Sequence, residues 1–254
     1  MTDLRISLLQ YDIVWHDCAA NIALIDGYLA HLAPNKTDLI VLPEMFTTGF
    51  TMNAAAYAEP WENSITRTWL AATAKRLNAA VIGSFIVEMN GKYYNRLVFM
   101  RPDGQCDTYD KRHLFAMGGE QKVFTAGIEK LLVMWRGWRL MPLICYDLRF
   151  PVWSRNTLDY DALIYIANWP TQRVGHWRNL LVARSIENQC FTIAVNRVGV
   201  DGNGLHYSGN SAVTDANGDK IADANEAATL VHAVLSRREL DDFRARLPFL
   251  KDRD

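Results

Sequence analysis

Three side chains with useful chemistry stand directly after segments that are expected to be strands. Glu44 and Cys145 follow short apolar segments with the composition of buried strands, and Lys111 follows the strand expected over residues 106–110. Charged side chains are rarely buried unless they are paired, and open α/β folds place their ligands at the ends of strands. We therefore expect a carboxylate, an ammonium and a thiol to meet in one pocket.

Together these three groups have the chemistry that hydrolysis of an amide requires. A free thiol has a pKa near ~8.5, so little thiolate exists at neutral pH and a base must accept the thiol proton. Glu44 is the candidate base, and it would return that proton to the departing amine. Lys111 and the backbone N–H of Tyr146 are candidates for stabilising the charge on the carbonyl oxygen. The expected intermediate is a thioester on Cys145, which water activated by Glu44 then hydrolyses.

The segments around these residues alternate between strand-like and helix-like patterns. Helices are expected over residues 21–32, 65–77 and 175–189, where apolar residues recur at the helical period. Residues 111–127 have no clean period and contain a Gly-Gly pair, so we expect a long functional loop there. Strands are expected over residues 5–10, 39–42, 80–87, 93–100, 106–110, 131–135, 139–144, 162–167, 191–196, 211–214 with the segment that follows, and 228–235.

This order of elements predicts an α/β chain with mixed sheets. Two sheets packed face to face, with helices on the outside, suit many strands and few helices. The alternation alone does not separate this arrangement from an ordinary three-layer sandwich. No linker, repeat or low-complexity tract divides the sequence, so residues 1–254 are expected to form one domain. The charged C-terminal tail after residue 235 carries no predicted element.

Composition narrows the classes of ligand and location. The formal net charge is −1 and no polycationic run occurs, so we expect a small molecule and no nucleic acid as partner. The longest apolar runs, such as residues 162–167, are strand-sized, which predicts no membrane span. The N-terminus has no secretory pattern and the four cysteines are far apart, which predicts a cytoplasmic protein with free thiols. Motifs for a metal, a nucleotide or an organic cofactor are absent, so none is expected.

Three sequence blocks carry a resemblance to a known family. They are LPEMF at residues 42–46, YDKRHLF at 109–115 and CYDLRFP at 145–151. In order and separation they resemble the blocks of the nitrilase (carbon–nitrogen hydrolase) superfamily, across nearly the whole chain. The resemblance implies a four-layer αββα sandwich, usually a homodimer. It also implies that Glu120 is a second glutamate that orients the lysine or helps to position substrate and water.

Within this family the resemblance is closest to the omega-amidases. It rests on CYDLRFPVWSR at residues 145–155 and on the block at residues 167–170. Such enzymes release ammonia from the terminal amide of 2-oxoglutaramate or 2-oxosuccinamate. The resemblance therefore implies a small keto-acid monoamide as substrate, hydrolysed without a cofactor.

Residues beside the catalytic candidates are expected to shape the pocket. A substrate carboxylate needs a cation, and Arg173 is the candidate, although a solvated arginine at a helix start is the plainer interpretation. Asp147 and Arg149 are expected to form structural pairs beside the nucleophile. Four aromatic residues are candidates for lining the pocket, and each is equally suited to the core: Phe46, Phe115, Tyr146 and Trp169.

Each catalytic candidate also has a structural interpretation. Cys145 taken alone is as well explained as an inert core cysteine, and Glu44 with Lys111 as a buried salt bridge. Glu120 lies in an irregular loop, where a solvated carboxylate is an ordinary finding.

Other functions remain open at this point. A nitrilase, a carbamoylase or an aliphatic amidase would use the same three residues, because the pocket decides the substrate. A Cys–His hydrolase would instead need a base such as His113 or His176, but the residues around Cys145 lack that signature. His113 is expected to support the loop beside Lys111. A catalytically silent binding module on the same fold is the third alternative.

Overall fold

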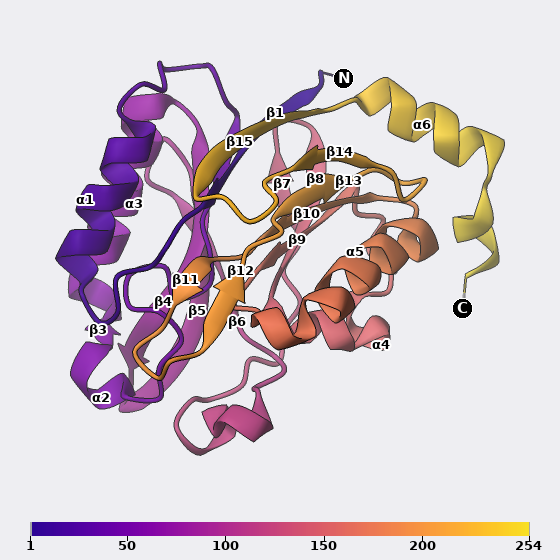
Figure 1. The fold of residues 1–254 in the computed structure, drawn as a ribbon. Coiled ribbons are helices and arrows are strands. Elements are labelled where there is room, and N and C mark those ends of the chain that lie inside the picture. Colours follow the sequence, from indigo (N-terminus) through magenta and orange to yellow (C-terminus); the bar gives the residue numbers. More distant parts are fainter. Residues whose placement is uncertain (1, 254) are drawn as a thin grey trace.

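Two β-sheets lie face to face at the centre of the computed structural model, which describes residues 2–253 (Figure 1). The seven-stranded sheet has the order β15-β1-β2-β4-β5-β6, with β3 paired to β4. The six-stranded sheet has the order β14-β13-β10-β9-β8-β7. The first sheet comprises β1 (Leu4–Gln10), β2 (Leu39–Val41), β3 (Glu59–Pro60), β4 (Ala80–Met89), β5 (Lys92–Met100), β6 (Cys106–Asp110) and β15 (Thr229–Leu235). The second comprises β7 (Val133–Trp135), β8 (Trp138–Ile144), β9 (Ala162–Ile166), β10 (Phe191–Val195), β13 (Ala212–Thr214) and β14 (Lys220–Asp223).

Helices cover the outer face of each sheet, which gives four layers in the order α, β, β, α (Figure 1). α1 (Cys18–Leu29) and α3 (Ile65–Leu77) lie against the first sheet. α5 (Val174–Asn188) and the short α4 (Pro151–Ser154) lie against the second. The predicted mixed α/β fold with two facing sheets is confirmed, and the three-layer alternative is wrong.

The core follows from the alternation of side chains along each strand. On β2, Leu39 and Val41 belong to the apolar cluster between the sheets. Ile40 belongs to the cluster beneath α1 and α3. Because successive strand side chains point to opposite faces, a strand buried on both faces is apolar throughout. This explains why the segment just before Glu44 is an unbroken apolar run.

Side-chain caps decide where two of the helices begin. Ser64 accepts a hydrogen bond from the N–H of Arg67 at 2.9 Å, so α3 starts at the predicted residue. Asp17 accepts one from the N–H of Ala20 at 2.9 Å, so α1 starts at Cys18 rather than at residue 21. The strands expected over these segments pair as antiparallel hairpins, β5–β6, β7–β8 and β13–β14.

Two elements were missed by the sequence patterns. The charged tail forms α6 (Arg237–Arg246), whose arginines 237 and 244 donate to the buried carboxylate of Asp161 at 2.9 and 3.0 Å. The hairpin of β11 (Val198–Val200) and β12 (His206–Ser208) is short, with three residues in each strand. A side chain at Gly202, in its turn, would overlap the Trp15 indole, so only glycine permits this close approach. Both elements depend on long-range contacts that no local pattern reveals.

The helices within residues 2–253 are all too short or too polar to cross a membrane.

The two-sheet core predicts that truncation of a buried isoleucine destabilises the protein far more than truncation of an exposed one. Ile166 on β9 is fully buried, whereas Ile128 is 73% exposed. Ile166→Ala removes buried methyl groups and leaves a cavity, so we expect the free energy of unfolding to fall by about 2–5 kcal/mol. Ile128→Ala is the matched control, with an expected change within about 0.5 kcal/mol. Denaturant titration of both variants measures this, and equal losses would contradict the assigned core.

Candidate active site

Cys145 lies where β8 ends and a 3-10 turn (Cys145–Arg149) begins. Its φ is 42°, in the left-handed region that non-glycine residues seldom adopt. Met45, directly after Glu44, also has a φ of 42°. Strained residues of this kind persist only where the surrounding structure holds them. The chain therefore turns sharply at Cys145 itself after β8, and at Met45, the residue after Glu44, beyond the end of β2.

The carboxylate of Asp147 holds the Cys145 turn against the segment that carries Lys111. Its Oδ2 accepts hydrogen bonds from the Tyr109 hydroxyl at 2.7 Å and from the N–H of Ile144 at 3.0 Å. Its Oδ1 accepts from the N–H of His113 at 3.0 Å and lies 2.7 Å from that residue's Nδ1. Asp147 thus bridges the two sheets and fixes Cys145 relative to Lys111. The predicted structural role of Asp147 and the supporting role of His113 are confirmed.

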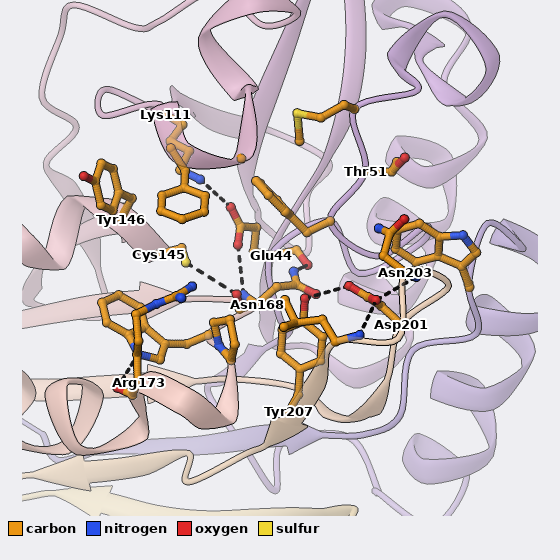
Figure 2. A pocket seen from close by; sticks show the side chains of 18 of the residues that line it. Glu44, Thr51, Lys111, Cys145, Tyr146, Asn168, Arg173, Asp201, Asn203 and Tyr207 are labelled. Carbon is orange, nitrogen blue, oxygen red and sulfur yellow. Dashed lines mark hydrogen bonds and ion pairs between the residues drawn. The ribbon is translucent and has the colours of Figure 1, made fainter.

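Lys111 lies between two fully buried carboxylates. Its Nζ donates to Glu44 Oε1 at 2.7 Å and to Glu120 Oε2 at 2.9 Å. Glu120 also accepts from the N–H of Phe115 at 2.6 Å. Asn95 on β5 completes the network by donating to Glu44 Oε1 at 2.8 Å. These contacts fix the position and direction of the ammonium, and Figure 2 shows the contact with Glu44.

The second oxygen of Glu44 contacts the loop after β9. Glu44 Oε2 accepts a hydrogen bond from the N–H of Asn168 at 2.9 Å. The thiol of Cys145 donates to the backbone oxygen of the same asparagine at 3.8 Å. Glu44, Asn168 and Cys145 are therefore packed together at one point, with Lys111 beside them (Figure 2).

Burial and charge set the protonation of these groups. Burial raises the pKa of the Cys145 thiol well above its usual value, and the charge of Glu44 raises it further although Lys111 opposes this. Burial favours a lower pKa for Lys111, but Glu120 and Glu44 outweigh burial and raise that pKa above its usual range. Burial also raises the pKa of Glu120, against the effect of Lys111. At neutral pH these shifts favour a protonated thiol beside a charged ammonium.

A cavity of about 580 Å³ opens on the reactive groups. Glu44, Lys111 and Cys145 line it, whereas Glu120 lies behind Lys111 and does not reach it. Glu120 is thus placed to orient Lys111 rather than to touch a ligand. The cavity is also lined by Phe115, Tyr146, Arg149, Asn168, Trp169, Arg173, Asp201 and Tyr207.

Four of the five residues expected to bind substrate do line the cavity, but Phe46 does not. Phe46 is fully buried in the cluster beneath α1 and α3, where its ring centroid lies 5.9 Å from that of Trp69. The sharp turn at Met45 directs neighbouring residues to opposite sides, so Glu44 faces the sheet interface and Phe46 the outer layer. The prediction for Phe46 is therefore corrected to a core residue.

Two arginines face the cavity on the side of Cys145 and Tyr146. Arg173 lies 5.5 Å from the Phe115 ring centroid, and Arg149 lies 4.8 Å from the Trp169 ring centroid. Neither forms an ion pair with an acidic residue between positions 2 and 253. The structural pair expected of Arg149 is a polar contact with His176 Nδ1 at 3.1 Å, not a contact with a carboxylate.

Sequence reasoning missed the far wall of the cavity. This wall includes the β11–β12 hairpin, where Tyr207 donates to Asp201 at 2.9 Å (Figure 2). Its strands of three residues carry no catalytic signature that a single sequence would reveal. Asn168, by contrast, lies in the block at residues 167–170, which contributes to the resemblance to the family.

Four layers around a buried Glu–Lys–Glu network beside a strand-end cysteine define a class of thiol hydrolase. The chain belongs to the carbon–nitrogen hydrolase family, whose sequence model matches residues 5–245. It is accordingly a hydrolase that acts on amide carbon–nitrogen bonds.

Particular relatives cover the whole chain. It is 47% identical to omega-amidase YafV of Yersinia enterocolitica, over 100% of this chain and 98% of that protein. It is 32% identical to the 2-oxoglutaramate amidase of Bacillus subtilis, over 97% and 96% of the two chains. A solved structure from Xanthomonas campestris, XC1258, is a CN-hydrolase superfamily protein with an arsenic adduct in its active site. It matches with a TM-score of 0.97 and 45% identity, over 100% and 98% of the two chains.

The raised pKa of Cys145 predicts a pH dependence for alkylation of its thiol. In a Glu44→Gln variant, which cannot accept the proton, iodoacetamide reacts only with thiolate formed by ionisation. Below the thiol pKa the thiolate fraction grows about tenfold per pH unit. We expect the alkylation rate to keep that slope from pH 7 to pH 9, measured by mass spectrometry of the Cys145 peptide. The charge of Glu44 is absent in this variant, so the slope tests the effect of burial, and a plateau below pH 8 would show that burial does not raise the thiol pKa.

Proposed function

We propose that this chain is an omega-amidase that hydrolyses the terminal amide of small 2-oxo-dicarboxylic acid monoamides to the acid and ammonia. 2-Oxoglutaramate and 2-oxosuccinamate are the expected substrates. The carrying observation is the Lys111 ammonium held between Glu44 and Glu120, at 2.7 and 2.9 Å, on the cavity that Cys145 lines. Full-length similarity to an omega-amidase and to a 2-oxoglutaramate amidase supports the choice of substrate.

In the acylation step, Cys145 attacks the amide carbon while Glu44 takes the thiol proton. A sulfur–carbon bond forms and the carbonyl oxygen becomes an oxyanion. Lys111 Nζ and the N–H of Tyr146 stabilise that oxygen, each by a few kcal/mol in comparable sites. Glu44 then gives the proton to the nitrogen, the carbon–nitrogen bond breaks, and ammonia leaves a thioester on Cys145.

In the second step, water attacks the thioester with Glu44 again as the base. Glu44 takes a proton from the water, and the carbonyl oxygen returns to the Lys111 position. When the carbon–sulfur bond breaks, Glu44 returns the proton to the sulfur and the free acid leaves. Glu120 takes no proton in this scheme, because its part is to hold Lys111 in place.

Charge balance supports Glu44 as the base in both steps. The high pKa of the buried Cys145 thiol disfavours a resting thiolate, so the proton must move during attack. Transfer from the thiol to Glu44 leaves the total charge of the buried site unchanged. A buried site of low dielectric tolerates such internal transfer better than it tolerates a new net charge.

The two arginines on the Cys145 side are the proposed ligands of the substrate carboxylate. Arg149 and Arg173 both line the cavity and have no carboxylate partner within residues 2–253. Charge-assisted hydrogen bonds from a guanidinium suit a planar carboxylate. This feature favours an acid-bearing amide over a neutral nitrile as substrate.

A Cys–His mechanism finds little support in the positions of the histidines. His113 is held by Asp147, with its ring stacked on Phe150 at 3.7 Å between centroids. His176 contacts Arg149 instead. The groups that act on the Cys145 pKa are Glu44, Lys111 and Glu120. A binding module without catalytic activity would not need these three charged groups around a cysteine.

We also propose a homodimer of single-domain chains that works in the cytoplasm. Exposed apolar side chains on α4, α5 and the final turn support an interface there, since Val152 is 87%, Ile186 49% and Phe249 60% exposed. All four cysteines are free, in keeping with a reducing compartment.

A substrate panel tests the proposed function. Ammonia release is measured with 2-oxoglutaramate, 2-oxosuccinamate, butyramide, a simple nitrile and an N-carbamoyl amino acid. We expect the two keto-acid amides to have the highest kcat/KM. Cys145→Ala should abolish turnover, and Glu44→Gln or Lys111→Ala should each lower kcat by orders of magnitude. A preference for the nitrile or carbamoyl compound would replace the proposal with another activity of the family.

Substitution of the arginines tests carboxylate binding. Arg149→Gln and Arg173→Gln are each expected to raise KM for 2-oxoglutaramate by roughly tenfold to a hundredfold, because a hydrogen bond to a charged group is lost. The kcat/KM for butyramide, which has no carboxylate, should hardly change. Arg238→Gln is the matched control, since that side chain is 90% exposed on α6. Equal losses with both substrates would assign the arginines to packing alone.

A further inference from the structure

The side-chain oxygen of Asn168 has no hydrogen-bond partner within residues 2–253, although it is buried. Asn168 is 5% exposed and lines the cavity that Cys145 and Glu44 share. A buried amide oxygen without a donor is costly, and in native proteins nearly all such groups are paired. The empty acceptor therefore indicates a donor supplied by a ligand.

The orientation of the Asn168 amide is fixed by its other contact. Nδ2 lies 2.6 Å from the backbone oxygen of Glu44. A carbonyl oxygen only accepts, so the atom facing it must be the NH₂ group, and a flipped amide would place two oxygens in contact. Oδ1 is therefore the free atom, and it can only accept.

Asn168 also lies against both reacting side chains. Its backbone N–H donates to Glu44 Oε2 at 2.9 Å, and its backbone oxygen accepts from the Cys145 thiol at 3.8 Å. Figure 2 shows Asn168 next to Glu44, on the opposite side from Lys111. In the proposed acylation step, the amide carbon bonded to Cys145 has its oxygen at Lys111, which leaves its nitrogen on the side of Glu44 and Asn168.

We propose that Asn168 Oδ1 is the acceptor for an N–H of the departing nitrogen, and that this contact is a specificity determinant for carboxamides. The inference rests on the proposed function and adds a residue to its acylation step. One N–H donates to Asn168 Oδ1, which turns the nitrogen lone pair toward Glu44. Glu44 then delivers the proton taken from Cys145, and the carbon–nitrogen bond breaks.

The contact is strongest when the nitrogen carries its additional proton. Hydrogen bonds from charged donors are roughly twice as strong as those between neutral groups. Asn168 therefore stabilises the departing ammonium more than the neutral amide, which raises the rate of acylation. An ester has no N–H at this position and leaves the oxygen unpaired. Sites built to hydrogen-bond an N–H discriminate against analogues that lack it.

The test compares an amide with an ester of the same acid. 2-Oxoglutaramate and the 5-methyl ester of 2-oxoglutarate give the same thioester on Cys145, so kcat/KM reports acylation alone. In Asn168→Ala we expect the amide-to-ester ratio of kcat/KM to fall by about tenfold to a hundredfold, as for a lost hydrogen bond to a charged donor. An unchanged ratio in a folded variant would overturn the proposal.

Two further variants separate this role from a structural one. Asn168→Gln keeps both an NH₂ donor and an acceptor oxygen, so its ratio should stay closer to that of the wild type than the ratio of Asn168→Ala, even if overall activity falls. Asn196→Ser is the matched control, because Asn196 accepts from the Trp169 N–H at 2.7 Å and supports the same loop without lining the cavity. Asn196→Ser should lower kcat/KM for the amide and for the ester by the same factor. A fall in the ratio equal to that of Asn168→Ala in either variant would assign the effect to loop packing.

The proposed function and this inference can fail separately. If the wild type does not turn over 2-oxoglutaramate, the proposed substrate is wrong. The ratio is then measured with the carboxamide that the panel identifies and its matching methyl ester. Loss of amide preference in Asn168→Ala would still support the acceptor role, and an unchanged ratio would still refute it.

Discussion

The buried ammonium of Lys111, held between two carboxylates, is the interaction on which the site depends. An isolated charge in this position would cost several kcal/mol in lost hydration, and the contacts from Glu44 and Glu120 offset that cost. Burial raises the pKa of the neighbouring Cys145 thiol, and the charge of Glu44 raises it further against the effect of Lys111. In the proposed mechanism the thiol therefore keeps its proton until attack on a substrate carbon.

The packing of the two sheets brings strand ends that are distant in the sequence to one point. Glu44 and Lys111 come from the first sheet and Cys145 from the second, so the site straddles the interface between them. Asp147 joins the two sides through its contacts with Tyr109, His113 and the strand end before Cys145. A small shift of one sheet over the other would strain this bridge before it separated the sulfur from the ammonium.

The sequence predicted what depends on local pattern and missed what depends on distant contacts. Buried strands, the start of α3 and the three turns between paired strands follow from apolar runs, a serine cap and turn residues. α6 was missed because its hold on the sheet comes from Asp161, far away in the chain. The prediction for Phe46 was wrong because the backbone turn at Met45 decides which layer its side chain enters. That direction cannot be deduced from the residue type.

Reaction and recognition are thus encoded in different parts of the molecule. The reacting groups stand at strand ends, and for Glu44 and Cys145 the apolar run of the preceding strand makes the position visible in the sequence. The walls that face a substrate come from loops and from the β11–β12 hairpin, which the core does not constrain. Such segments can change without disturbing Lys111 or Cys145. One catalytic arrangement can therefore act on amides of different shape, and the walls alone decide which amide enters.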